Sequence, residues 1–227
     1  MAALYNNFIY QPILSALVWI YQTVSFGDLG VAIILLTVLI RVVLLPLFYR
    51  GAKNQSLLQR LQPHVKKIQL DHKDNKEAQA RALMELYKTH HVNPLSGFFF
   101  ILLQLPVFIA LFQIFTKELG GAAFDSHTLL GLIDLEAKGF VLPLIAAAFQ
   151  YFQGKLSLPP PQAAAGAPGG AAMGKVMVIA GPFITVMVLI NLPSALGIYW
   201  IVSSVFSIGQ QLYINRHLPA LESQHQP

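Results

Sequence analysis

The sequence contains no cysteine, and only 11% of its residues are charged, whereas soluble domains have about a quarter. Without cysteine there can be no disulfide framework, no thiolate metal site and no thiol nucleophile. The low charge, combined with 55% hydrophobic residues, excludes an ordinary soluble domain. The 227-residue chain is therefore predicted to be an all-α membrane protein that crosses the bilayer several times.

Catalytic and nucleotide-binding motifs are also missing. The sequence has no G-x-x-x-x-G-K-[ST] phosphate loop and no H-E-x-x-H, and its seven histidines lack metal-ligand spacing. We therefore expect no enzymatic activity, no metal and no other cofactor. The net charge of +5 comes mostly from one segment between apolar runs, which indicates membrane topology and not sequence-specific nucleic-acid binding.

Apolar runs predict five membrane spans. Their expected limits are 29–49, 93–116, 138–156, 175–191 and 194–214. Residues 1–28 hold only a short uninterrupted apolar run among aromatic and amide side chains. An amphipathic helix lying in the membrane interface is expected there, with a sixth span as the alternative. Asp28 is placed to cap the first span.

Charge asymmetry predicts the orientation of these spans. Residues 50–92 carry nine Lys and Arg against four Asp and Glu, so this segment is expected in the cytoplasm. Its apolar stripes predict two helices that form an antiparallel hairpin. Asp74 is expected to cap the second helix, with Glu77 completing a capping box.

The remaining loops agree with this orientation. The acidic loop 117–137 is expected outside the cell, and the Pro/Ala/Gly-rich 157–174 is expected to be a flexible cytoplasmic linker. The tail 215–227 is cytoplasmic on this scheme. The N-terminus then lies outside and the C-terminus inside.

Arg41 is the charged residue inside the apolar segments, whose interiors contain no Asp, Glu, His or Lys. A charge at the bilayer centre costs about 2.5 to 3.5 kcal/mol on insertion scales, so an unpaired arginine needs water or polar groups around it. The polar and aromatic candidates for such a lining are Thr37, Gln104, Gln150, Gln153, Trp200, Ser203, Ser207 and Gln210. Any one of them could instead hold helices together by hydrogen bonding. Because such bonding does not explain the charge, we predict that the spans surround a hydrophilic groove.

Several stretches together resemble the YidC/Oxa/Alb family of membrane protein insertases. They are GVAIILLTVLIRVVLLPL around Arg41, LLQRLQPHVKKIQ, ALMELYKTHHVNPLSG, LLQLPVFIALFQ and SALGIYWIVSSVFSIGQQ. The resemblance implies a five-helix bundle of the bacterial inner membrane with a cytoplasmic hairpin. In that family the groove is open to the cytoplasm and the lipid, and Arg41 would be its positive charge. Gln150 or Gln153, and Trp200, look like further groove positions.

The resemblance implies an insertase and chaperone for nascent membrane proteins that works without ATP, in contact with the lipid bilayer. The ribosome and the Sec translocon are candidate partners. The alternative is a small transporter or channel in which Arg41 binds an anion, although such proteins usually carry a coupling carboxylate inside the membrane. A third interpretation is an assembly subunit in which Arg41 makes an inter-subunit contact.

Overall fold

The computed structural model describes residues 2–93, 96–119, 121, 124–156 and 170–217. The described residues are mostly helical, in agreement with the predicted all-α class. The elements in chain order are α1 (Ala2–Tyr5), the π-helix η1 (Asn6–Tyr10), α2 (Gln11–Thr23), α3 (Leu29–Val43), α4 (Leu45–Arg60), α5 (Gln62–Asp71), α6 (Lys76–Thr89), α7 (Ser96–Lys117), β1 (Thr128–Leu129), β2 (Ile133–Asp134), α8 (Val141–Leu156), α10 (Gly170–Leu189) and α11 (Ser194–His217).

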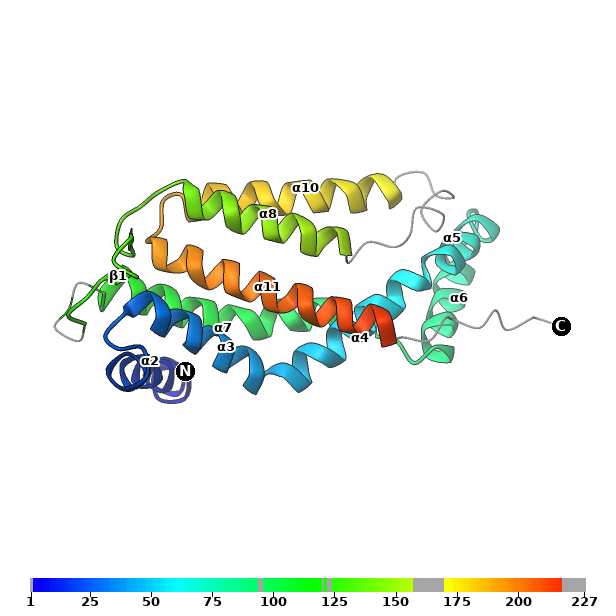
Figure 1. Cartoon of the computed structure of the whole chain (residues 1–227). Coiled ribbons are helices and arrows are strands. Elements are labelled where there is room, and N and C mark those ends of the chain that lie inside the picture. Colours follow the sequence, from blue (N-terminus) through cyan, green and yellow to red (C-terminus); the bar gives the residue numbers. More distant parts are fainter. Residues whose placement is uncertain (1, 94–95, 120, 122–123, 157–169, 218–227) are drawn as a thin grey trace.

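Helix α11 is the centre of the bundle (Figure 1). It packs against α8 on one side and against α3, α4 and α7 on the other, while α10 packs mainly on α8. Helix α2 packs against α3 and α7. The main core lies where α2, α3, α7 and α11 meet, and its fully buried members include Leu17, Leu36, Leu111 and Leu196.

The segment predicted as one span, 29–49, is not one helix. Helix α3 ends at Val43, and the chain bends by 68° before continuing as α4. Pro46 explains the break, because it has no backbone N–H and its ring would clash with the carbonyl of Val42 in a continuous helix. Pro46 instead lies in the first turn of α4, where a missing N–H costs nothing. Asp28 caps α3 as predicted, since its Oδ1 accepts from Val31 N at 2.8 Å.

The predicted helical hairpin is present, with two corrections. Its first arm is interrupted at Leu61, where Pro63 in the first turn of α5 starts a new helix that packs against α6. The cap of α6 is Asn75 and not Asp74, because Asn75 Oδ1 accepts from Ala78 N at 3.0 Å. Glu77 forms an ion pair with Arg81 at 2.5 Å.

The limits of α10 and α11 also differ from the predicted ones. Helix α10 begins at Gly170, so the linker does not extend to 174 as predicted. Helix α11 continues to His217, three residues beyond the predicted end of the last span at 214. The remainder of the predicted linker, 157–169, and of the predicted tail, 218–227, lies outside the described residues.

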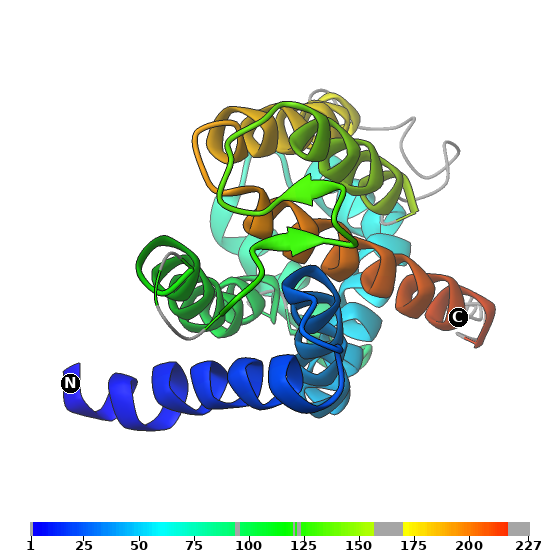
Figure 2. The same cartoon turned by 60° about the vertical axis from the view of Figure 1, so that its left-hand side comes forward.

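The loop 117–137 contains a small β-hairpin that the sequence analysis did not predict. Strands β1 and β2 are antiparallel and lie over one end of the bundle (Figure 2). The loop is docked there by backbone bonds, because Ala195 N donates to Leu135 O at 3.1 Å and Ser194 N donates to Ala137 O at 3.0 Å. The hydroxyl of Tyr21 accepts from two further backbone N–H groups of the loop.

Helix length and composition identify candidate spans within the described residues. Helix α11 alone is long and apolar enough to cross a membrane, and α3 with α4 passes the same test only if the bent pair is counted as one span. The apolar stretches Gln104–Lys117 and Val178–Leu189 are shorter. The number of five spans therefore stays a prediction.

Candidate functional site

Arg41 lies in the last turn of α3, immediately before the break at Leu44. The negative end of the helix dipole is at this terminus, which favours a cation by about 0.3 to 1 kcal/mol. The guanidinium carbon lies 4.8 Å from the centre of the Phe48 ring, on the first turn of α4. The bend thus folds an aromatic face over the half-buried charge. No ion pair between Arg41 and a carboxylate occurs in the described parts of the chain.

Tyr199 of α11 is the second polar residue of this site. Its side chain is buried, and its hydroxyl accepts a hydrogen bond from Nε2 of Gln104 on α7. Tyr199 and Arg41 also interact electrostatically. Three helices, α3, α7 and α11, therefore contribute polar groups to one region, which we call the Arg41 cluster: Arg41, Gln104, Tyr199 and Ser203.

Ser203 extends the Arg41 cluster one turn along α11. Its side chain is 6% exposed, and its hydroxyl interacts with that of Tyr199 one turn earlier on the same helix. Ser203 therefore adds a second hydroxyl of α11 to the Arg41 cluster.

Thr37 and Ser207 lie near the Arg41 cluster but bond within their own helices. Thr37 is buried, and its hydroxyl donates to Ile33 O at 2.6 Å. Ser207 donates to Ser203 O at 2.9 Å. Both hydroxyls keep free lone pairs, so each can still accept a hydrogen bond.

Trp200 contributes an aromatic wall next to the Arg41 cluster. Its ring meets that of Phe108 on α7 edge to face, with the centroids 5.7 Å apart. The Phe108–Trp200 and Gln104–Tyr199 contacts lie one helical turn apart on α7 and join it to α11. Trp200 thus helps to fix the distance between the two helices.

The predicted glutamines on α8 and at the far end of α11 do not join the Arg41 cluster through hydrogen bonds. Gln150 accepts a hydrogen bond from the hydroxyl of Thr185 on α10, so it lies in the contact between α8 and α10. Gln153 and Gln210 are half-buried, and neither forms a hydrogen bond with the Arg41 cluster among the described side chains. The structure therefore brings together Arg41, Gln104, Trp200 and Ser203 of the predicted set.

Sequence reasoning missed two polar features. Tyr199 precedes Ser203 by four residues and so shares its helix face, a spacing that could have identified it. The second is a buried network at the root of the hairpin, where Gln211 Nε2 donates to Ser56 Oγ at 2.8 Å and to Asn215 Oδ1 at 2.9 Å. This network ties α11 to α4.

The donor set of the Arg41 cluster contains no carboxylate, imidazole or thiolate. Across the described residues, no group of three or more His, Cys, Asp or Glu is placed to hold a metal ion. A cation next to amide and hydroxyl groups instead suits a negatively charged or strongly polar ligand.

Comparison with known families gives one clear match. The model of the 60Kd inner membrane protein family matches residues 19–221. The chain belongs to the 60Kd inner membrane protein family. Its matched region includes every helix that contributes to the Arg41 cluster, and the membership confirms the resemblance to YidC-type proteins found in the sequence.

Curated relatives in this family carry the name "Membrane protein insertase YidC". The protein of Geobacter sulfurreducens is 35% identical over 94% of this chain and 38% of its own length. That of Nitratidesulfovibrio vulgaris is 38% identical over 92% of this chain and 39% of its own length. That of Geotalea daltonii is 33% identical over 92% and 38%, respectively. The chain thus spans about two fifths of the length of these relatives.

Proposed function

We propose that the chain is a membrane protein insertase and chaperone of the bacterial inner membrane. The observation that carries the proposal is Arg41, a cation held at a helix break beside amide and hydroxyl groups and without a carboxylate partner in the described structure. Membership of the 60Kd inner membrane protein family and the names of the curated relatives support it.

In the proposed mechanism, the Arg41 cluster lines a hydrophilic groove that opens to the cytoplasm and the lipid. A carboxylate of an entering substrate 4 Å from the guanidinium would gain about 4 kcal/mol at an effective dielectric of 20, against about 1 kcal/mol in water. Gln104, Tyr199 and Ser203 offer further hydrogen bonds to the polar segment. The gain offsets part of the cost of bringing a polar tail into the membrane.

Release into lipid supplies the driving force. The apolar part of the substrate leaves the groove sideways, and burial of its surface stabilises the inserted state by about 25 cal/mol per Å². A span of about 20 apolar residues is sufficient for stable insertion, so no ATP is required. No catalytic step and no cofactor are part of this mechanism.

In the proposed arrangement five helices span the membrane, with the N-terminus outside, the C-terminus in the cytoplasm and residues 1–28 in the outer interface. The α5–α6 hairpin then lies in the cytoplasm, where its basic side chains meet nascent membrane proteins, with the ribosome and the Sec translocon as candidate partners. An anion transporter is less well supported, since the apolar segments contain no acidic residue that could couple transport to an ion.

The experiment compares wild-type protein with Arg41→Lys and Arg41→Ala in vesicles that receive a single-span substrate with an acidic N-terminal tail. Wild type and Arg41→Lys should translocate the tail, and Arg41→Ala should not. Arg50→Ala is the matched control, because Arg50 is an exposed arginine on the neighbouring helix α4. Equal translocation with and without the protein would overturn the insertase proposal, and equal activity of all three Arg41 forms would overturn the role of the charge.

A further inference from the structure

Two turns at one end of the bundle share an unusual feature. In Ser25–Asp28, both central residues have positive φ, 54° at Phe26 and 77° at Gly27, and Asp28 N donates to Ser25 O at 3.0 Å. These are the marks of a type I′ turn. Asn, Asp or Gly is favoured at its first central position, because a bulky side chain is strained at positive φ. Here that position is occupied by phenylalanine.

The β-hairpin between β1 and β2 repeats this pattern. Leu130 and Gly131 have φ of 52° and 69°, and Leu132 N donates to Leu129 O at 2.9 Å. A leucine therefore occupies the strained first central position of the second turn. Both turns place a bulky apolar residue in front of a glycine, where the local backbone disfavours it.

Asp28 joins the two turns. One of its carboxylate oxygens caps α3, and the other accepts from Leu130 N at 2.5 Å. The two turns are therefore held as neighbours. We call the three apolar side chains that they carry, Phe26, Leu130 and Leu132, the apolar tips.

The apolar tips expose large apolar side chains, which is energetically unfavourable in water. Phe26 is 100% exposed, Leu130 68% and Leu132 84%. The backbone strains Phe26 and Leu130, and the exposure of all three side chains leaves much of their apolar surface unburied by the rest of the chain. Both costs point to an apolar phase outside the chain.

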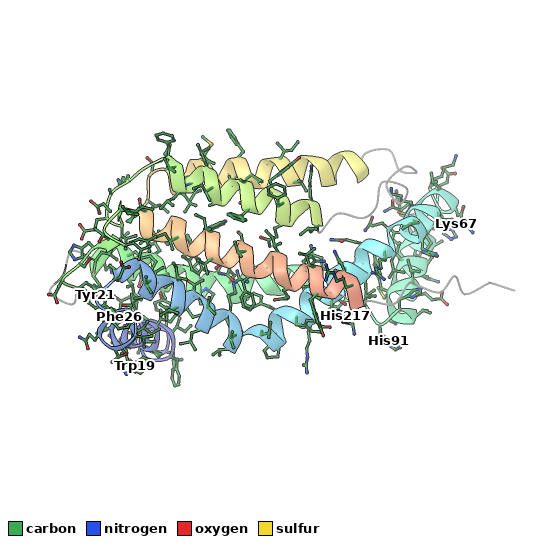
Figure 3. The ribbon with its side chains drawn as sticks, in the orientation of Figure 1. Trp19, Tyr21, Phe26, Lys67, His91 and His217 are labelled. Carbon is green, nitrogen blue, oxygen red and sulfur yellow. The ribbon has the colours of Figure 1, made fainter. Side chains whose placement is uncertain are left out.

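The surroundings indicate which apolar phase this is. Trp19 on α2, and Phe140 and Val141 at the start of α8, are also exposed at this end of the bundle. In Figure 3, Trp19, Tyr21 and Phe26 lie together, whereas Lys67, His91 and His217 lie at the opposite end. The apolar tips thus lie at the same end of the bundle as the start of α8 and the exposed Trp19.

We propose that the apolar tips insert into the outer leaflet of the bilayer, at the boundary between headgroups and acyl chains. The loop 117–137 is then not wholly in water, and the two turns anchor the outer end of the bundle. This inference rests on the proposed function, because it requires the helices to span the membrane. On this proposal, lipid covers the apolar tips. Coverage by a partner protein is the competing outcome of the test.

The absence of cysteine allows a direct test by site-directed spin labelling of the full chain. Single cysteines are introduced as Phe26→Cys, Leu132→Cys, Asp125→Cys and Leu39→Cys, and the labelled proteins are reconstituted in vesicles of phosphatidylethanolamine and phosphatidylglycerol. Collision rates with dissolved oxygen, which concentrates in lipid, are compared with those of a water-soluble nickel chelate. Asp125 is an exposed polar residue of the same loop, and Leu39 is an exposed residue of the apolar helix α3.

Labels at positions 26 and 132 are expected to favour oxygen over the nickel chelate several-fold more than the label at 125. Preference for the nickel chelate at 26 and 132 would overturn the proposal, and so would protection from both reagents, since that indicates a covering protein. The label at 39 separates this result from failure of the proposed function. If position 39 also reports water, the spanning arrangement itself is wrong.

Discussion

The side-chain amide of Gln104 donates a hydrogen bond to the hydroxyl of Tyr199, which joins α7 to α11 beside Arg41. Both residues lie within apolar helices. The hydrogen bond therefore pairs an amide N–H with a hydroxyl oxygen, and either group would be energetically unfavourable without a partner. Removal of the Tyr199 hydroxyl leaves the Gln104 amide without its acceptor. Tyr199→Phe should therefore lower the free energy of unfolding by about 1 to 3 kcal/mol.

Reversible unfolding in mixed micelles measures this change. Tyr151→Phe is the control, because the ring of Tyr151 contacts the Lys155 ammonium and phenylalanine keeps that contact. Equal stability of the Tyr199→Phe variant and wild type would show that the bond contributes nothing net.

Gly197 permits close packing of α11 on α8. A Cβ atom at this position would lie 2.9 Å from Leu142 Cβ, closer than real Cβ contacts allow. Gly197→Ala should therefore destabilise the bundle by about 1 to 3 kcal/mol through overpacking. Gly209→Ala in the same helix has open space around its Cβ and should be neutral or stabilising by up to about 1 kcal/mol. The same unfolding assay distinguishes the two, and a larger loss at position 209 would contradict the packing seen here.

Tyr10 should give the fold a dependence on alkaline pH. Burial, together with the hydrogen bond to Glu118 at 2.9 Å and its negative charge, raises the pKa of Tyr10 from 10.0 to about 12. Because folding raises this pKa, the contribution of the protonated hydroxyl to stability is complete below pH 10 and is lost as the pH rises through about 12. Unfolding free energies measured across this range should fall more steeply for wild type than for Tyr10→Phe. Identical slopes would argue against a role for this pair.

The buried amide of Gln211 should hold the hairpin root to the bundle. Gln211→Met keeps the side-chain volume but leaves Ser56 and Asn215 without their donor, so a loss of about 1 to 3 kcal/mol is expected. Gln210→Met, at the half-buried neighbouring position, should have a smaller effect. Hydrogen exchange of α4 should rise in the first variant only, and unchanged protection would contradict the proposed attachment.

Local signals in the sequence predicted where helices form, but they did not predict how the helices contact one another. Asp28 capped α3 as expected, because a cap depends on residues a few positions apart. The break at Leu44 was missed although Pro46 is visible, since the apolar run continues through the proline and membrane helices tolerate such residues. The β-hairpin was missed because its turn places leucine where Asn or Gly is the usual signal.

The sequence predicted what kind of site the protein has, but only some of the residues that form it. An unpaired arginine in an apolar run is visible from composition alone, and Arg41 indeed lies beside polar groups of two other helices. Which face of each helix turns toward it depends on packing. Tyr199 therefore joins the site beside its predicted neighbour Trp200, and Gln150 bonds to Thr185 in a different interface.

The length of α3 changes the energetic problem that Arg41 presents. A helix of 15 residues rises about 22 Å, which is shorter than the roughly 30 Å hydrocarbon core. In the proposed orientation α3 starts at the outer face, so its end falls short of the inner face by about 8 Å and Arg41, two residues earlier, by about 11 Å. Cytoplasmic water therefore needs to penetrate only about a third of the hydrocarbon core to reach the guanidinium. A proline three residues beyond the end of α3 thus sets the depth at which this protein can keep a permanent charge hydrated.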